Sequence, residues 1–369
     1  MMKNTLVKVG IIGCGRIAGH HCRAIVATPG TKLVAVCDLS EEKAMAYGVE
    51  FGAKVYTNYH QMLQNHPDID TVAVITPSGM HYEHALDIIC RYRKNIIVEK
   101  PTFMRPSQVA EVYDRAASVG VSVFAIFQNR YNSAVRRVHS GINNGELGDI
   151  RSISVRVRWC RQQRYYDMSH WRGTFALDGG CLTNQGIHHV DLLRLMGGEV
   201  DRVCSIHRTL GSNIEVEDTA TATLLFKSGA LGTLEITTAA RPTDYEASIS
   251  FVCEKGLAQI GGIAVNQLQL YSPEPEACIK ESEDFSGNVY GLGHFKIYQD
   301  IVVACRGEQP FPVTRTDTMA TIQLLNAFYR SDENCGWVDV ASVGESSRLG
   351  RFDDELASLY RTEVPLDVE

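Results

Sequence analysis

The sequence lacks the features that mark several other classes of protein. No apolar run reaches the ~18 residues that a membrane-spanning helix needs, and residues 1–8 lack the charged-then-apolar pattern of a signal peptide. The 11 cysteines include no C-x-x-C pair, which is typical of reduced thiols rather than of disulfides or a zinc site. The net charge of -7 disfavours a general binder of nucleic acid or of anionic membranes. We therefore expect a cytoplasmic protein with no nucleic-acid or membrane partner.

Low-complexity tracts are also missing, and the composition is that of a folded protein. The chain is 44% hydrophobic and 21% charged, so it can build buried cores. Its 369 residues are too many for one ordinary domain. Length alone therefore predicts two domains of unequal size.

Closely spaced glycines follow the first apolar run of the chain. Gly13 permits a tight turn, Gly15 lets the backbone approach a pyrophosphate without a Cβ, and Ala18 is small enough for close packing of helix on strand. The helix that begins near Arg16 offers its N-terminal N–H groups and its dipole to phosphates. We interpret this stretch as a dinucleotide site.

Asp38 ends the second apolar strand, 23 residues after Gly15. The acid that binds the ribose hydroxyls of NAD lies roughly 20 residues beyond such a motif. A carboxylate there repels a 2′-phosphate, so the sequence favours NAD over NADP. The alternative is that Asp38 is only a solvated residue at a strand end.

Strand-like and helical segments alternate through the first third of the chain. This alternation predicts a doubly wound parallel sheet in an N-terminal domain of residues 1–127. The predicted strands are 6–12, 33–37, 54–56, 71–75, 95–98 and 121–126. The predicted helices are 17–27, 44–51, 59–65, 82–91 and 107–118.

Beyond Gln128 the pattern changes, which predicts a second domain over residues 128–369. Ile150–Arg158 alternates apolar and polar residues with period two, as expected of an antiparallel sheet with one polar face. More strands are predicted at 200–207, 219–226, 230–238, 247–253, 257–260 and 267–271. Two late helices, 295–306 and 316–331, either pack on this sheet or return to the first domain. We expect an α/β protein whose C-terminal α+β domain has a large, mostly antiparallel sheet.

Glu99, Lys100 and Pro101 follow a buried strand, a place where an isolated lysine calls for a functional explanation. An ammonium near a nicotinamide and a substrate hydroxyl would stabilise a developing alkoxide, orient the hydroxyl or relay a proton. Pro101 would fix the turn, and we expect a cis bond before it. Residues 76–81 end another strand beside the expected cofactor, and there we expect His81 to cap the next helix rather than to catalyse.

The second group of candidate catalytic residues lies in 178–193. Apolar spacing predicts a helix over 182–196, on which Asn184, His188 and Asp191 share one face. An imidazole is suited to take a hydroxyl proton near neutral pH, so we interpret His188 as a base, the alternative being a core histidine. His189 points about 100° away and is expected to pack or to face solvent. A zinc site made by His188, His189 and His170 is disfavoured, because no supporting ligand spacing is present, and we expect no metal.

Together these motifs resemble the Gfo/Idh/MocA oxidoreductases. The resemblance rests on Gly13-x-Gly15-x-x-Ala18, on the turn at Lys100, and on Gly179-Gly180 followed by Asn184-x-x-x-His188-x-x-Asp191. It implies a Rossmann domain, a C-terminal sheet domain and NAD(P)-dependent oxidation of a sugar or cyclitol hydroxyl, with Lys100 and His188 catalytic. It also implies a homodimer or homotetramer formed through the C-terminal sheet. Asn184 stands where many members have Asp, so we expect it to bind a substrate hydroxyl instead of relaying a proton.

Residues 171–188 and 91–98 resemble bacterial nucleotide-sugar 3-dehydrogenases, which oxidise the C3 hydroxyl of UDP-N-acetylglucosamine or its uronic acid. Arginines suit a diphosphate or a carboxylate, and aromatic rings suit a base or a sugar. The expected substrate contacts are Arg158, Arg164, Trp171, Arg172, Asn184 and His188. The expected cofactor contacts are Gly13, Gly15, Arg16, Ile17, Asp38, Thr76, Pro77, His81, Glu99, Lys100 and Gln128. The alternatives are a dehydrogenase of free sugars or inositol, a ketosugar reductase, or a non-enzymatic regulator that senses dinucleotide.

Overall fold

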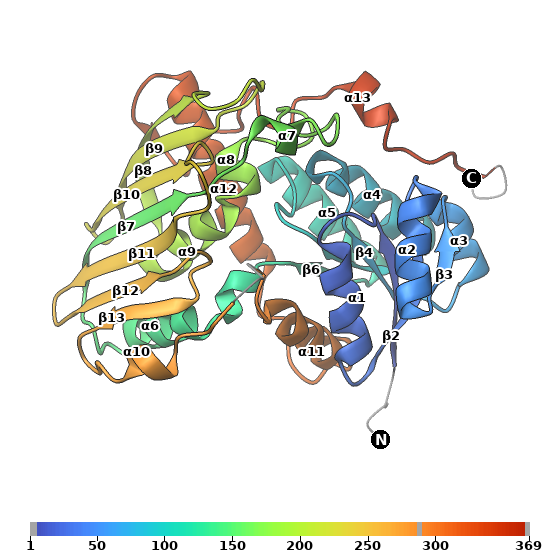
Figure 1. Cartoon of the computed structure of the whole chain (residues 1–369), viewed down its shortest axis with the longest axis horizontal. Helices are drawn as coiled ribbons and strands as arrows, with labels where there is room; N and C mark the ends of the chain where they lie inside the picture. Colours follow the sequence, from blue (N-terminus) through green and yellow to red (C-terminus); the bar gives the residue numbers. More distant parts are fainter. Residues whose placement is uncertain (1–5, 286–289, 366–369) are drawn as a thin grey trace. The chain divides into compact units, whose positions relative to one another are not determined.

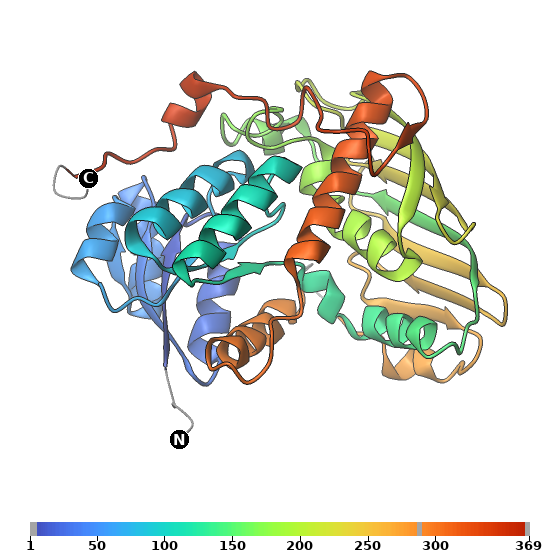
Figure 2. The same cartoon turned by 180° about the vertical axis from the view of Figure 1, so that it is seen from behind.

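The computed structural model describes residues 6–285 and 290–365 (Figures 1 and 2). The chain divides into two compact units. The first unit contains the residues up to 126 together with 294–318 and the segment from 352 onward, and the second contains 127–293 and 319–351. The first division lies within one residue of the expected boundary. The two later segments, which the sequence assigned to the range 128–369, group with the N-terminal unit.

The first unit is built on a six-stranded parallel sheet of order β3-β2-β1-β4-β5-β6. The strand order reverses between β1 and β4, and ligands of such sheets bind beyond the carboxyl ends of the strands at that reversal. The strands are β1 (Val7–Ile12), β2 (Thr31–Cys37), β3 (Lys54–Tyr56), β4 (Thr71–Val74), β5 (Asn95–Val98) and β6 (Val123–Ala125). The predicted doubly wound sheet is confirmed.

Local signals define most helices of this unit. The Ser40 side chain accepts a hydrogen bond from the backbone N–H of Lys43 (3.4 Å) at the start of α2, and Gly52 ends that helix in the left-handed conformation. Pro106 occupies the first turn of α5, and Gly120 ends it. The helices are α1 (Ala18–Ala27), α2 (Glu41–Phe51), α3 (Tyr59–Asn65), α4 (His81–Asp87), α5 (Pro106–Val119), α11 (Gly293–Cys305) and α13 (Asp354–Ser358), with shorter helical turns at Ser78–Met80 and Ile88–Tyr92.

The second unit is built on an eight-stranded sheet of order β13-β12-β11-β7-β10-β9-β8-β14. Among the described strands of this sheet, β7 and β10 are the one parallel pair, so the predicted mostly antiparallel sheet is confirmed. The strands are β7 (Ile150–Arg158), β8 (Val200–Arg208), β9 (Thr219–Phe226), β10 (Leu231–Thr237), β11 (Glu246–Cys253), β12 (Leu257–Gly261), β13 (Gln267–Tyr271) and β14 (Val338–Asp339).

Helices cover one face of this sheet, on which the apolar positions of β7 are buried (Figures 1 and 2). The helices with residues in this unit are α6 (Ser133–Asn143), α7 (Gln163–Tyr166), α8 (Cys181–Asn184), α9 (Ile187–Gly197), α10 (Ala277–Lys280) and α12 (Arg315–Glu333), with a helical turn at Gln128–Tyr131. Residues 315–318 of α12 belong to the first unit. Among the described residues, no helix has both the length and the apolar character that a membrane crossing requires.

The predicted continuous helix over 182–196 is wrong, because the helix breaks between α8 and α9. The N–H of Gly186 bonds to the carbonyl of Cys181, five residues back (2.7 Å), which widens the helix at that point. A Cβ on Gly186 would lie 2.4 Å from Cδ1 of Ile236 in β10, so a larger residue at 186 would require the Ile236 side chain to move. Asn184 therefore belongs to α8, whereas His188 and Asp191 belong to α9.

Candidate cofactor and substrate sites

Glycine is present at two positions of the first loop, 13 and 15, for different structural reasons. Gly13 has φ +94°, and a Cβ there would lie 2.4 Å from the carbonyl oxygen of Ile75, so the loop packs against the end of β4 only without a side chain. Gly15 is exposed, and its Cβ would meet no protein atom within 4 Å. The space in front of Gly15 is therefore open to a ligand that must approach the backbone closely. The neighbouring Arg16 is exposed, and Ile17 is half-buried.

Asp38 is fixed beside this loop at the end of β2. Its Oδ2 accepts a hydrogen bond from the N–H of Cys14 (2.7 Å), and its Oδ1 accepts one from the N–H of Ser40 (2.9 Å). Each carboxylate oxygen can accept a further hydrogen bond. Because Asp38 is half-buried and anchored to the glycine loop, its position suits the acid that binds ribose hydroxyls.

His81 does not cap a helix with its side chain, contrary to the expectation from sequence. It is buried, with Nδ1 2.8 Å from the carbonyl oxygen of Pro101 and Nε2 3.0 Å from that of Thr76. Its ring therefore joins the turn after β4 to the turn after β5. Burial lowers the pKa of His81, and the two carbonyl contacts oppose that effect only in part. Thr76 and Pro77 are half-buried in the same turn.

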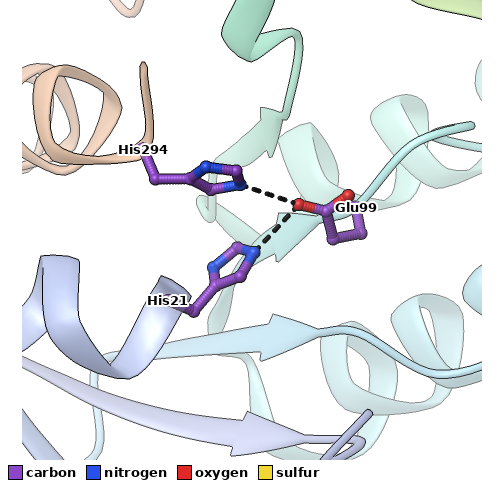
Figure 3. Close-up of side chains that lie close together, drawn as sticks. All are labelled: His21, Glu99 and His294. Carbon is purple, nitrogen blue, oxygen red and sulfur yellow. Dashed lines mark hydrogen bonds and ion pairs between the residues drawn. The ribbon is translucent and has the colours of Figure 1, made fainter. Parts of the chain in front are cut away.

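The turn that carries Lys100 is held from behind by Glu99. The predicted cis peptide bond before Pro101 is present. Glu99 is buried, and its Oε2 accepts a hydrogen bond from the N–H of Lys100 (3.0 Å). Its Oε1 lies 2.9 Å from Nε2 of His21 and 3.2 Å from Nε2 of His294 (Figure 3). Sequence reasoning named Glu99 as a cofactor contact and missed both histidines.

Asp178 organises the glycine pair of the second unit. Its Oδ2 accepts a hydrogen bond from the N–H of Gly173 (2.7 Å), and its Oδ1 accepts one from Nδ2 of Asn184. Gly179 has φ +68°, and a Cβ on Gly180 would collide with the carboxyl group of Glu217. The side-chain amide of Asn184 is therefore fixed by a carboxylate that sequence reasoning gave no role.

His188 lies in the first turn of α9 and is buried, with its ring perpendicular to that of Phe127 at a centroid distance of 6.4 Å. Asp191, one turn later, accepts two hydrogen bonds from Arg130 (2.7 and 2.6 Å), so it fixes the turn at 128–131. His189 packs against Trp159 (6.0 Å between ring centroids), and burial lowers its pKa to about 4, which confirms the expectation that it packs.

Arg172 is the arginine of the predicted substrate set with the most defined surroundings. Its guanidinium lies 4.5 Å from the ring centre of Trp171 and 4.3 Å from that of Tyr165. Nη1 donates to the Tyr165 hydroxyl (2.5 Å), which also accepts from Nε2 of Gln185 (3.3 Å). This group of residues 165, 171, 172 and 185 combines a fixed cation with two aromatic rings.

The structure does not bring the other two arginines of the set to this group. Arg158 donates to Glu235 (2.7 Å) and Glu246 (3.3 Å) across the face of the sheet opposite to the buried residues of β7. Arg164 is exposed on α7. Gln128, an expected cofactor contact, is buried in the helical turn that Asp191 holds.

The comparisons with known proteins agree with this architecture. Residues 7–127 match the oxidoreductase family with an NAD-binding Rossmann fold, and residues 135–259 match the GFO/IDH/MocA C-terminal domain. The WlbA dehydrogenase from Bordetella pertussis, solved in complex with NADH and UDP-GlcNAcA, is 31% identical with a TM-score of 0.85, over 91% of this chain and 98% of that one. The chain belongs to the GFO/IDH/MocA oxidoreductase family.

Two further proteins are similar to this GFO/IDH/MocA chain, one in structure and one in sequence. The WlbA dehydrogenase from Chromobacterium violaceum, also solved with NADH and UDP-GlcNAcA, is 30% identical with a TM-score of 0.84, over 92% of this chain and 97% of that one. Myo-inositol 2-dehydrogenase from Thermotoga maritima is 26% identical, over 62% of this chain and 68% of the relative.

As a GFO/IDH/MocA member, the chain is an NAD-dependent oxidoreductase, and its own residues fit that cofactor. The open space at Gly15 fits a pyrophosphate, and the anchored carboxylate of Asp38 fits a ribose that carries no 2′-phosphate. When bound, NAD supplies the acceptor for a hydride.

Proposed function

We propose that this chain oxidises a ring hydroxyl, at C3, of a nucleotide-linked amino sugar. The observation that carries the proposal is the guanidinium of Arg172, which is close to two aromatic rings and hydrogen-bonded to one of them, six residues before Asp178 and the glycine pair. A planar cation with several donors suits a diphosphate or a sugar carboxylate, and the rings suit a base or a sugar face. The two WlbA structures that contain UDP-GlcNAcA support the same class of substrate.

His188 acts as the base in this proposal. Oxidation of a secondary alcohol removes a hydride from carbon and a proton from oxygen, so a group that accepts the proton is required. His188 is an imidazole at the first turn of α9, and a hydrogen bond joins Asp178 and Asn184, which precede it in the same stretch of chain. Asn184 contacts a sugar hydroxyl, in the role that its amide suits.

Lys100 orients the same hydroxyl and stabilises the negative charge that develops on its oxygen. The lysine stands directly after the buried end of β5, and Glu99 holds its backbone. Glycine residues 13 and 15 and Asp38 bind the dinucleotide.

A dehydrogenase of free inositol is the second candidate, and one observation favours it. Myo-inositol 2-dehydrogenase from Thermotoga maritima is among the relatives of the chain. A cyclitol carries no diphosphate, so this candidate gives Arg172 no anionic partner.

A substrate panel tests the proposal. The purified protein is incubated with NAD and UDP-GlcNAcA, UDP-GlcNAc, myo-inositol or free sugars, and absorbance of reduced cofactor is followed, with an added oxidant in a parallel series to turn over cofactor that stays bound. We expect turnover with a UDP-amino sugar and little with inositol. Faster turnover of inositol than of either UDP-sugar would refute the nucleotide-sugar assignment.

Variants of Arg172 separate the two candidates further. Arg172→Lys keeps the charge but loses the planar group beside the two rings, so we expect the KM for the UDP-sugar to rise roughly 10-fold or more with kcat less affected. Arg151→Lys changes an exposed arginine of β7 and is the matched control. An unchanged KM in Arg172→Lys would remove Arg172 from the substrate site.

A further inference from the structure

Glu99 is the centre of a buried polar network in the first unit. Its Oε1 lies between Nε2 of His21 in α1 and Nε2 of His294 in α11, at 2.9 and 3.2 Å, and its Oε2 accepts the N–H of Lys100 (Figure 3). The exposed fractions of His21, His294 and Glu99 are 0%, 1% and 5%. One carboxylate therefore joins two helices to the backbone of the lysine turn.

The protons of this network can be assigned from its donors. Burial raises the pKa of Glu99, but the hydrogen bonds from His21 and His294 outweigh it and hold that pKa well below its usual value. Burial lowers the pKa of His21. Neutral His21 then donates through Nε2 to Glu99 and accepts at Nδ1 from the hydroxyl of Tyr298 (2.9 Å). The hydrogen bonds run in one direction, from Tyr298 through His21 to Glu99.

The same three side chains are the one group among residues 6–285 and 290–365 with the composition of a metal site. A metal-bound imidazole must present a lone pair, whereas both Nε2 atoms lie at hydrogen-bond distance from one carboxylate oxygen. Two N–H donors and an ionised acceptor satisfy one another without an ion. The group is therefore complete as a hydrogen-bonded support, and the metal content of the purified protein distinguishes this support from a metal centre.

We propose that His21 and His294 are positioning residues that hold Lys100 in place through Glu99. His21 is the fourth residue of α1, the helix that follows the glycine loop, so the network also ties the dinucleotide loop to the lysine turn. His294 lies far along the chain and reaches Glu99 because the segment 294–318 groups with the first unit. The kinetic consequence rests on the proposed role of Lys100, whereas the structural link does not.

Hydrogen exchange of the Lys100 amide tests the link without any substrate. His294→Leu removes the donor at similar volume, and we expect this amide to exchange roughly 10-fold faster or more, because Glu99 loses a charge-assisted hydrogen bond. His294→Gln restores a donor at the same reach and should return the exchange rate towards that of the wild type. His60→Leu is the matched control, because His60 is also buried in this unit but bonds to Tyr92 (2.8 Å).

Kinetics with the substrate found by the panel give the second measurement. Loss of Lys100 positioning should lower kcat of His294→Leu roughly 10-fold or more with little change in NAD binding, and His294→Gln should recover most of it. The primary deuterium isotope effect on kcat should rise in His294→Leu, since hydride transfer becomes slower relative to product release. A protein that is only less stable would show fewer active molecules and an unchanged isotope effect.

The following results of the exchange and metal measurements would overturn the proposal. Equal exchange of the Lys100 amide in the wild type and in His294→Leu, or equal acceleration in His294→Leu, His294→Gln and His60→Leu, would show that the network does not hold the turn. Stoichiometric zinc or another divalent metal in the purified protein, lost on His294→Leu, would identify a metal site instead. If no substrate is turned over, the proposed function fails, and the exchange measurement still decides the network.

Discussion

Replacing Glu217 with glutamine should change how the stability of the second unit depends on pH. Glu217 is buried behind the glycine pair, where its Oε1 accepts hydrogen bonds from the hydroxyl of Tyr329 (2.8 Å) and the N–H of Leu182 (3.2 Å). In the part of the chain that the structure describes, Oε2 has no hydrogen-bond partner. Burial therefore dominates over these two donors and raises the pKa of Glu217 to about 7.

The direction and size of the change in the free energy of unfolding with pH follow from this pKa. An unfolded glutamate titrates near pH 4.3, so over roughly 2.5 pH units the folded chain holds a proton that the unfolded chain has lost. The free energy of unfolding therefore falls as pH rises from about 4.5 to about 7, by about 3 kcal/mol in total at 1.36 kcal/mol per unit. Glu217→Gln lacks this titration. Relative to the wild type, the variant should thus gain about 3 kcal/mol between pH 4.5 and pH 8.

Tryptophan fluorescence during thermal unfolding measures the effect in the right unit, since all 3 tryptophans lie in residues 127–293 and 319–351. The difference in Tm between Glu217→Gln and wild type should change by on the order of 10 °C over this pH range. Glu333→Gln is the opposite control, because burial of Glu333 is outweighed by hydrogen bonds from Ser346 and Arg330 that lower its pKa. A Tm difference for Glu217→Gln that stays constant with pH would refute the reasoning.

Three other predictions concern the cofactor and the catalytic pair. Gly15→Ala should leave the Tm unchanged in calorimetry but weaken NAD binding roughly 10-fold or more in a titration, because its Cβ meets no protein atom. Gly13→Ala should lower the free energy of unfolding by roughly 2–5 kcal/mol, because its Cβ would collide with the backbone. Asp38→Ala should weaken NAD binding about 10-fold in the same titration and reduce the ratio of NAD affinity to NADP affinity. An unchanged NAD affinity would show that Asp38 does not contact the ribose. Lys100→Met and His188→Asn should each lower kcat by roughly 10²–10⁴-fold, and the double variant should lose less than the product of the two if both act on one hydroxyl. His189→Asn, next to His188 on α9 but packed on Trp159, is the control that should retain kcat.

Most of the fold was predictable because its signals are local. Buried apolar runs placed β1 and β4 to within a residue, and the period-two pattern of β7 placed all of Ile150–Arg158. The same period also shows that Arg158 shares a face with Arg156, away from Val155 and Val157. The ion pairs of Arg158 on that face were therefore within reach of sequence reasoning, which instead grouped it with the arginines that follow it.

The failures occur where distant segments decide the local structure. The break between α8 and α9 lies where Gly186 comes close to Ile236, and apolar spacing along one segment contains no information about a strand 50 residues later. The two ring nitrogens of His81 lie 3.0 and 2.8 Å from the carbonyl oxygens of Thr76 and Pro101, and the second of these belongs to another turn. The segment 294–318 groups with the first unit through tertiary packing, which the sequence around it does not reveal. The sequence near His294 therefore did not indicate that His294 contacts Glu99.

The two buried glutamates show why a site's electrostatics cannot be read from residue types alone. Glu99 and Glu217 each lie behind a turn that the motifs identified, and each is almost fully buried. Glu99 receives two imidazole N–H groups and a backbone N–H, so its pKa falls well below the usual value. Glu217 receives one hydroxyl and one backbone N–H on a single oxygen, so its pKa rises to about 7. The direction is decided by the number and kind of donors that the tertiary structure supplies to each oxygen, so the ionisation of each glutamate depends on contacts that no motif records.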